Sequence, residues 1–139
     1  MLLALACDSE ERESETTAAT VAPIPADPAS LQPSEGGLYL AGLRSQDGEV
    51  PIGRMHSWVF HVETVEGTFF QPVRLAVSGG MPQHGHGFVT EPRVTRVLGN
   101  GDFLVEGVKF HMAGDWTFRF EVVGPAGPDV AIFHVQVDP

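Results

Sequence analysis

The 139-residue sequence has few of the residues that mark disulfide-rich, nucleic-acid-binding or membrane-spanning proteins. Its single cysteine, Cys7, excludes a disulfide within the chain. Lysine and arginine number 8 against 18 acidic residues, and the formal net charge is −10. No basic surface is therefore available to neutralise phosphates, and we expect no nucleic-acid partner. No apolar run approaches the ~18 residues that are needed to span a bilayer.

The cysteine ends the apolar stretch "LLALAC", and a polar, acidic stretch follows it. This pattern is typical of the end of a secretory signal, and "ALAC" resembles a bacterial lipobox. We therefore expect residues 1–7 to be the remnant of a lipoprotein signal peptide that starts upstream of Met1, with lipid on Cys7. Asp8 resembles the signal that retains Gram-negative lipoproteins at the inner membrane, so the expected location is extracytoplasmic and lipid-anchored, in the periplasm. An ordinary N-terminus with an unmodified thiol is the alternative.

Residues 8–37 are rich in Glu, Ser, Thr, Ala and Pro and contain almost no large apolar side chain. Such a segment cannot bury enough surface to offset its ordering entropy, so we predict a disordered linker. Residues 1–37 hold seven acids and one base, a net charge of −6, which leaves −4 for the rest of the chain. The sequence therefore predicts a solvating tether followed by one folded domain at residues 38–139.

From Leu38 onward, short apolar and β-branched runs alternate with turns of Gly, Pro and Asn. No segment has a useful helical period, and "NGD" at 100–102 is the strongest short hairpin signal. This spacing predicts an all-β fold, an antiparallel immunoglobulin-like sandwich of about seven strands. The predicted strands are 37–43, 56–63, 72–79, 93–99, 103–112, 116–124 and 130–137. The expected aromatic core includes Trp58, Phe60, Phe110, Trp116, Phe118 and Phe120.

Strand alternation assigns the histidines to faces, because successive side chains point to opposite sides. His61 and His134 share their parity with polar residues, so we expect both on solvent-facing sides. His56 shares its parity with Trp58 and faces the core at the start of its strand. Met112 shares its parity with Phe110 and is also expected to face inward, whereas its neighbour His111 points the other way.

The stretch "MPQHGHGF", residues 81–88, places a thioether and two imidazoles close together. Imidazole and thioether donors favour copper, Cu(I) in particular, over zinc, calcium or magnesium. If the loop covers the mouth of the sandwich, it meets residues from other strand ends there. The candidate copper ligands are Met81, His84, His86 and Met112, with His56 as a helper and His111 as an adjunct. The alternative is a Gly-Pro turn with exposed histidines and core methionines.

These motifs, taken together, resemble the YtkA-like, FixH-related family of small extracytoplasmic β domains. The resemblance rests on "MPQHGHGF", "TEPRVT", "LGNGDFLVEGVKFHMAGDWTFRFEV" and "GRMHSWVFHVET", and it covers about residues 37–138. Residues that match the family's two main motifs are Met81, Pro82, His84, Gly85, His86 and Gly87, then Phe110, Met112, Gly114 and Trp116. The resemblance implies a small β domain, and similarity to periplasmic copper chaperones that use His and Met favours copper as the ligand.

Three classes of function compete for this chain. The first is a membrane-tethered copper carrier or accessory protein, in copper delivery to a respiratory oxidase or in copper tolerance, with a copper-receiving or copper-exporting membrane protein as partner. The second is a non-catalytic immunoglobulin-like module that binds a protein and no metal. The sequence has no nucleophile elbow, phosphate loop or carboxylate pair near the histidines, so we expect no enzyme. We also expect a monomer.

Overall fold

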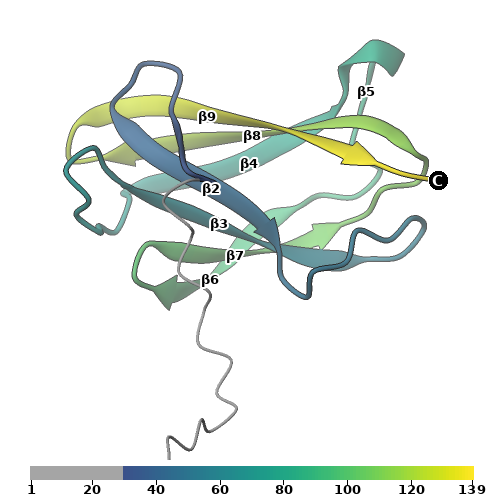
Figure 1. Ribbon diagram of the computed structural model, residues 1–139, viewed down its shortest axis with the longest axis horizontal. Helices are drawn as coiled ribbons and strands as arrows, with labels where there is room; N and C mark the ends of the chain where they lie inside the picture. Colours follow the sequence, from purple (N-terminus) through teal and green to yellow (C-terminus); the bar gives the residue numbers. More distant parts are fainter. Residues whose placement is uncertain (1–29) are drawn as a thin grey trace, which may run out of the picture.

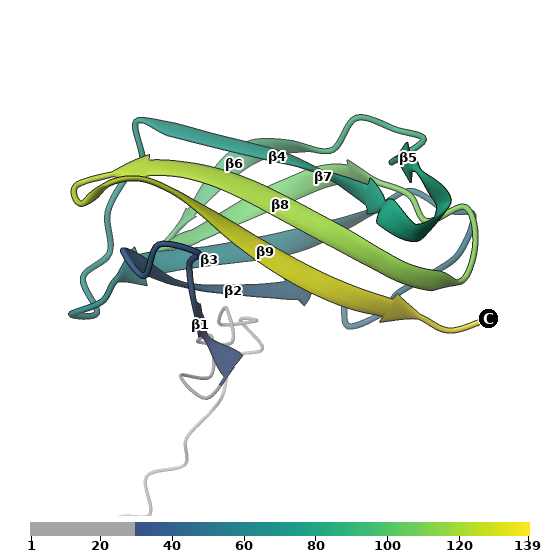
Figure 2. The ribbon, with the colours of Figure 1, turned by 90° about the horizontal axis from the view of Figure 1, so that it is seen from above.

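This computed structural model describes residues 30–139 of the chain. They form two antiparallel sheets that are stacked face to face (Figures 1 and 2). The first sheet has the order β1 (Gln32–Pro33), β2 (Tyr39–Ser45), β3 (His56–Thr64), β7 (Asp102–Val108), β6 (Arg93–Gly99). The second has the order β5 (His86–Gly87), β4 (Arg74–Met81), β8 (Gly114–Gly124), β9 (Gly127–Val137). The predicted antiparallel sandwich is confirmed, and the two strands beyond the expected seven are the two-residue strands β1 and β5.

Alternating side chains of the two sheets fill the space between them. In β8, Trp116, Phe118, Phe120 and Val122 are buried, and the residues between them are more exposed. Phe120 stacks on Phe60 of the facing sheet, with ring centroids 4.0 Å apart. All six aromatic residues predicted for the core are at most 5% exposed. The core prediction is therefore confirmed. It follows from the alternation of inward-facing and outward-facing side chains along each strand.

The β6–β7 hairpin is the turn that the sequence indicated most strongly. Gly99 pairs with Asp102, so the loop between them is the two-residue Asn100–Gly101. Both loop residues have positive φ, 53° and 82°, as a type I′ turn requires. A Cβ on Gly101 would lie 2.7 Å from the Val62 carbonyl oxygen, so only glycine fits there. The turn thereby brings Asp102 against β3.

The ordered domain begins earlier than the sequence predicts. Residues 30–37, assigned to the disordered linker, include β1 and the buried Ser34. The Asp129 carboxylate accepts hydrogen bonds from Ser34 Oγ (2.6 Å), Gly36 N (2.8 Å) and Leu38 N (3.1 Å). Amino-acid composition does not predict this attachment, because it is formed by polar side chains and backbone groups and involves no large apolar side chain. The rest of the predicted linker, the signal remnant and Cys7 lie outside the described residues.

This attachment changes the acidity of Asp129. Burial would raise the pKa of its carboxyl, but the hydrogen bonds from Ser34, from the neighbouring Val130 N–H and from two further backbone amides outweigh burial. The pKa therefore lies below its ordinary value. The carboxylate form is the one that holds the segment before β2 onto β9.

One end of the sandwich gathers segments that are distant in sequence. In the first sheet, β3 begins and β7 ends there, since His56 pairs with Val108. In the second sheet, β8 begins there, beside the ends of β4 and β9, as the pairs Gly80–Thr117 and Gly114–Val137 show. β5 and the C-terminus lie at this same end (Figure 1). We call it the His/Met end. In residues 30–139, no helix has the length and apolar character to cross a membrane.

Candidate metal site

The "GGMPQHGHG" stretch folds back sharply on the end of β4. A Cβ on Gly80 would lie 2.4 Å from the Gly87 Cα, so glycine is what lets β5 approach β4. Pro82 opens a 3₁₀ turn, Pro82–His84, and Gly85 closes it with a φ of 70° and a hydrogen bond from its N–H to the Pro82 carbonyl. The chain then returns as β5, in which His86 pairs with Met81. The glycines and proline therefore fix where both loop histidines project.

Three imidazoles lie in series at the His/Met end, and we call His84, His86 and His111 the imidazole cluster. The ring centroids of His84 and His86 are 5.8 Å apart, and those of His86 and His111 are 5.1 Å apart. All three residues are exposed. The sequence treated His111 as an adjunct that points away from the site, yet it is the direct neighbour of His86.

A buried indole lies beneath this cluster. Trp116 is fully buried, and its ring centroid lies 5.3 Å from that of His111 and 6.4 Å from that of His86. Its Nε1–H donates to the Met112 carbonyl at 3.1 Å, which fixes the chain between β7 and β8. The cluster therefore stands on a rigid aromatic base, while its imidazoles face solvent.

The two predicted methionine ligands differ in their surroundings. Met81 is 1% exposed, and its Cε lies 2.6 Å from where a Cβ on Gly114 would be, so it packs tightly into the core. Met112 is 36% exposed, and the prediction that it faces inward is wrong. β7 ends at Val108, so strand alternation does not extend to residue 112. The same break in the strand explains the placement of His111.

His56 lies apart from the imidazole cluster. Its ring contacts Phe110 and Trp58, with centroid distances of 5.1 and 6.1 Å. Its Nδ1 lies 3.1 Å from the Arg54 carbonyl oxygen, which can only accept, so Nδ1 carries the hydrogen. Its Nε2 is buried without a hydrogen-bond partner, as is Trp58 Nε1. In this tautomer Nε2 has the free lone pair that a metal ligand needs. The five sequence-predicted ligands nevertheless do not converge on one point.

The conformation seen here does not form a closed metal site. Among residues 30–139, no three His, Cys, Asp or Glu side chains are arranged to hold a metal ion. The His84 and His86 rings stack at an interplanar angle of 24°, with centroids 5.8 Å apart. Because both side chains are exposed, rotation about their side-chain bonds meets little steric resistance. The donors fit copper in type, and they would have to reorient to bind it.

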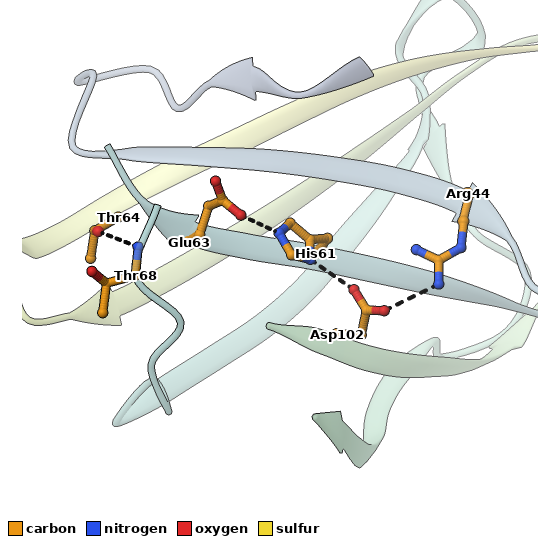
Figure 3. A network of polar contacts seen from close by, with 6 residues as sticks. All are labelled: Arg44, His61, Glu63, Thr64, Thr68 and Asp102. Atoms are coloured by element: carbon orange, nitrogen blue, oxygen red, sulfur yellow. Dashed lines mark hydrogen bonds and ion pairs between the residues drawn. The ribbon is translucent and has the colours of Figure 1, made fainter. Parts of the chain in front are cut away.

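A second polar group, which the sequence pattern does not predict, surrounds His61 (Figure 3). His61 was expected in solvent, but it is 5% exposed. Its Nδ1 lies 2.8 Å from Asp102 Oδ1 and its Nε2 lies 2.8 Å from Glu63 Oε2. Asp102 also accepts from Arg44 at 3.2 Å. Both ring nitrogens of His61 therefore face carboxylate oxygens.

The burial of His61 comes from a loop that strand parity does not consider. The Phe69 ring, in the β3–β4 connection, meets the imidazole edge-on with centroids 5.8 Å apart. The hairpin turn at Gly101 lies against both rings, since a Cβ there would be 2.9 Å from His61 Cε1 and 3.2 Å from Phe69 Cδ1. Because both ring nitrogens already face carboxylates, neither is open to a metal ion. His134, in contrast, is exposed as predicted.

The fold defines an antiparallel β-sandwich with an open group of imidazoles at one end. In comparisons with known proteins, no family model, no curated protein and no solved structure matches the chain.

Proposed function

We propose that the domain binds copper at the His/Met end and serves as a non-catalytic, extracytoplasmic copper carrier or accessory protein. The observation that carries this proposal is the placement of the soft donors. All three methionines of the described residues (Met55, Met81, Met112) lie at that end, together with the histidines His56, His84, His86 and His111. Imidazole and thioether together are a donor set that suits copper in both oxidation states.

The imidazole cluster supplies the first contacts with the ion. His84, His86 and His111 are exposed and offer nitrogen donors on two separate segments, which Trp116 holds side by side. Met112, next to His111, adds an accessible thioether. Met81 lies in the core, where it shapes the loop. An open set of ligands favours release to a partner over permanent retention, since incoming ligands can reach the ion without unfolding the site.

The proposed membrane tether and the proposed partner rest on features of the sequence. Lipid on Cys7 and the linker would hold the domain at a bacterial membrane on its periplasmic side, near a copper-receiving or copper-exporting membrane protein. The resemblance to the YtkA-like, FixH-related family supports such a location and a small copper-handling domain. The alternative is a protein-interaction module that binds no metal. The experiment that tests copper binding also tests this alternative.

The test is a Cu(II) titration of the full chain carrying Cys7→Ser, which removes the thiol as a competing ligand. Tryptophan fluorescence reports binding, because Cu(II) near the cluster should quench Trp116. We expect His84→Ala with His86→Ala to abolish tight binding, and His134→Ala, an exposed histidine on β9, to leave it unchanged. Affinity should also fall in acid, because an imidazole must be neutral to bind a metal. Equal affinity of the parent and the double variant would refute the copper proposal in favour of the interaction module.

A further inference from the structure

The tip of the β6–β7 hairpin carries the one asparagine of the chain, Asn100, directly before Gly101. The Asn100 side chain is exposed to solvent. Asparagine followed by glycine is the dipeptide most prone to deamidation, because the glycine nitrogen reaches the asparagine side chain without hindrance from a side chain of its own. The tip is therefore a place where the chain can be modified without an enzyme, and the conformation of the turn controls that reaction.

The reaction needs water as its only co-reactant. The backbone nitrogen of Gly101 attacks the side-chain amide carbon of Asn100. A C–N bond forms, the proton of the attacking nitrogen passes to the amide nitrogen, and ammonia leaves. Water then opens the resulting five-membered imide. Cleavage of its bond to the side-chain carbon gives aspartate, and cleavage of its bond to the main-chain carbon gives isoaspartate, in which the backbone runs through the side chain.

The closed turn prevents this attack. The φ angles of Asn100 and Gly101 are 53° and 82°, the values of a type I′ turn, in which the first central residue has ψ near about +30°. At that ψ, the Cβ of Asn100 and the nitrogen of Gly101 lie on nearly opposite sides of the Cα–C bond. Ring closure requires them on the same side, so Gly101 has to swing out of its place.

Contacts with β3 oppose this rotation. Gly101 is buried, and its carbonyl accepts a hydrogen bond from the Val62 N–H at 2.9 Å. A Cβ on Gly101 would lie 2.7 Å from the Val62 carbonyl oxygen, so the two backbones are in close contact. The next residue, Asp102, pairs with Gly99 across the turn and contacts His61 (Figure 3). The imide can therefore form only after the hairpin tip has separated from β3.

We propose that Asn100 is a deamidation site gated by opening of the β6–β7 hairpin, and that isoaspartate at this position keeps the tip from closing again. Isoaspartate adds one carbon atom to the backbone, which the two-residue loop between Gly99 and Asp102 cannot hold in the same register. An opening that ends in reaction thus leaves a permanent change and withdraws Asp102 from His61. This inference does not depend on the proposed copper site.

The first experiment compares rates in the folded and unfolded protein. The full chain is incubated at mildly alkaline pH, with and without denaturing urea, and mass spectrometry follows the conversion of amide to carboxylate. We expect the folded chain to react at least about tenfold more slowly, because the reaction has to wait for local opening. Asn100→Ser should abolish the change in mass, since no other asparagine is present. Equal rates in the two states overturn the gating, and a change in mass that persists in Asn100→Ser overturns the site.

The second experiment measures opening independently, through hydrogen exchange of the Val62 amide that is bonded to Gly101. Asp102→Ala should speed deamidation and Val62 exchange by the same factor, whereas Asp115→Ala, which removes an exposed acid on β8, should change neither. If Asp102→Ala does not fold, Phe69→Ala gives the same comparison, because the Phe69 ring lies against the tip. Deamidation that does not follow Val62 exchange overturns the gating.

The fate of the product tests the second half of the proposal. The isoaspartate form, separated by chromatography, should unfold at a lower urea concentration than Asn100→Asp. The matched variant carries the same added charge without the extra backbone carbon, so the difference reports the lengthened turn alone. Equal urea midpoints overturn the claim that isoaspartate keeps the hairpin open.

Discussion

Replacing Asp102 by alanine should destabilise the domain more than any other change of a single charged residue at the His61 group. The carboxylate is 3% exposed and accepts from His61 Nδ1 and from Arg44. Its loss leaves a buried imidazole N–H without an acceptor and an arginine without its partner. Removal of one partner of a buried ion pair typically costs ~3–5 kcal/mol.

The low end of that range applies here, for two structural reasons. The Arg44 side chain is 28% exposed, so water can solvate the freed guanidinium. His61 also keeps its second contact, with Glu63 at 2.8 Å. We therefore expect a loss of about 3 kcal/mol in the free energy of unfolding, a large part of the ~5–15 kcal/mol that a domain possesses.

Urea unfolding of matched variants measures this cost. Asp115→Ala removes an exposed acid on β8 and should change stability by less than about 0.5 kcal/mol. The pair Asp102→Leu with His61→Leu should lose less than the sum of its two single changes, because the double change leaves neither residue of the His61–Asp102 contact without the other. The loss of a partner by Arg44 and by Glu63 occurs in the single changes as well. The reasoning is refuted if Asp102→Ala behaves like Asp115→Ala, or if the two changes to leucine add.

Three further predictions concern the core and the N-terminal attachment. Phe118→Ala should cost ~3–5 kcal/mol in urea unfolding, because it leaves a cavity at a fully buried position; normal stability would mean that the β8 register is wrong. Folding lowers the pKa of Asp129. The stability that its carboxylate contributes is therefore complete above the unfolded pKa of about 3.9 and is lost as pH falls through the folded pKa. Asp129→Asn should make the free energy of unfolding depend less on pH in this acidic range. Deletion of residues 1–29 should change stability by less than about 0.5 kcal/mol, whereas deletion of 1–37, which removes Ser34, should cost measurably more; equal effects would count against the attachment.

The strands and their inner faces could be predicted because period-2 alternation is a local property of the chain. Phe118 and Phe120 were assigned to the core from their spacing alone, and both are fully buried. The Asn100–Gly101 turn was equally predictable, since its residues tolerate the positive φ that a two-residue hairpin loop needs. Where neighbouring residues determine the structure, the sequence was sufficient.

The placement of His61 could not be predicted in the same way. Alternation correctly put it on the outer face of β3, but it says nothing of what covers that face. The Phe69 loop and the hairpin turn at Gly101 do so, and both are tertiary contacts. Glu63, two residues along the same strand and therefore on the same face, was the one local signal for a paired histidine. Asp102 became its second partner only through the pairing of β3 with β7.

The candidate site combines both situations, and this explains why it was only partly predicted. His84 and His86 are brought together by their own turn, so their proximity was readable from "HGH". His111 joins them because strands from two sheets end at one place, which no local pattern encodes. A group assembled from several strand ends is also one in which each ligand can move without disturbing the core. If copper binds there, the stability of the sandwich and the exchange of the metal are therefore separable, and variants of these exposed side chains should alter affinity while the unfolding midpoint stays unchanged.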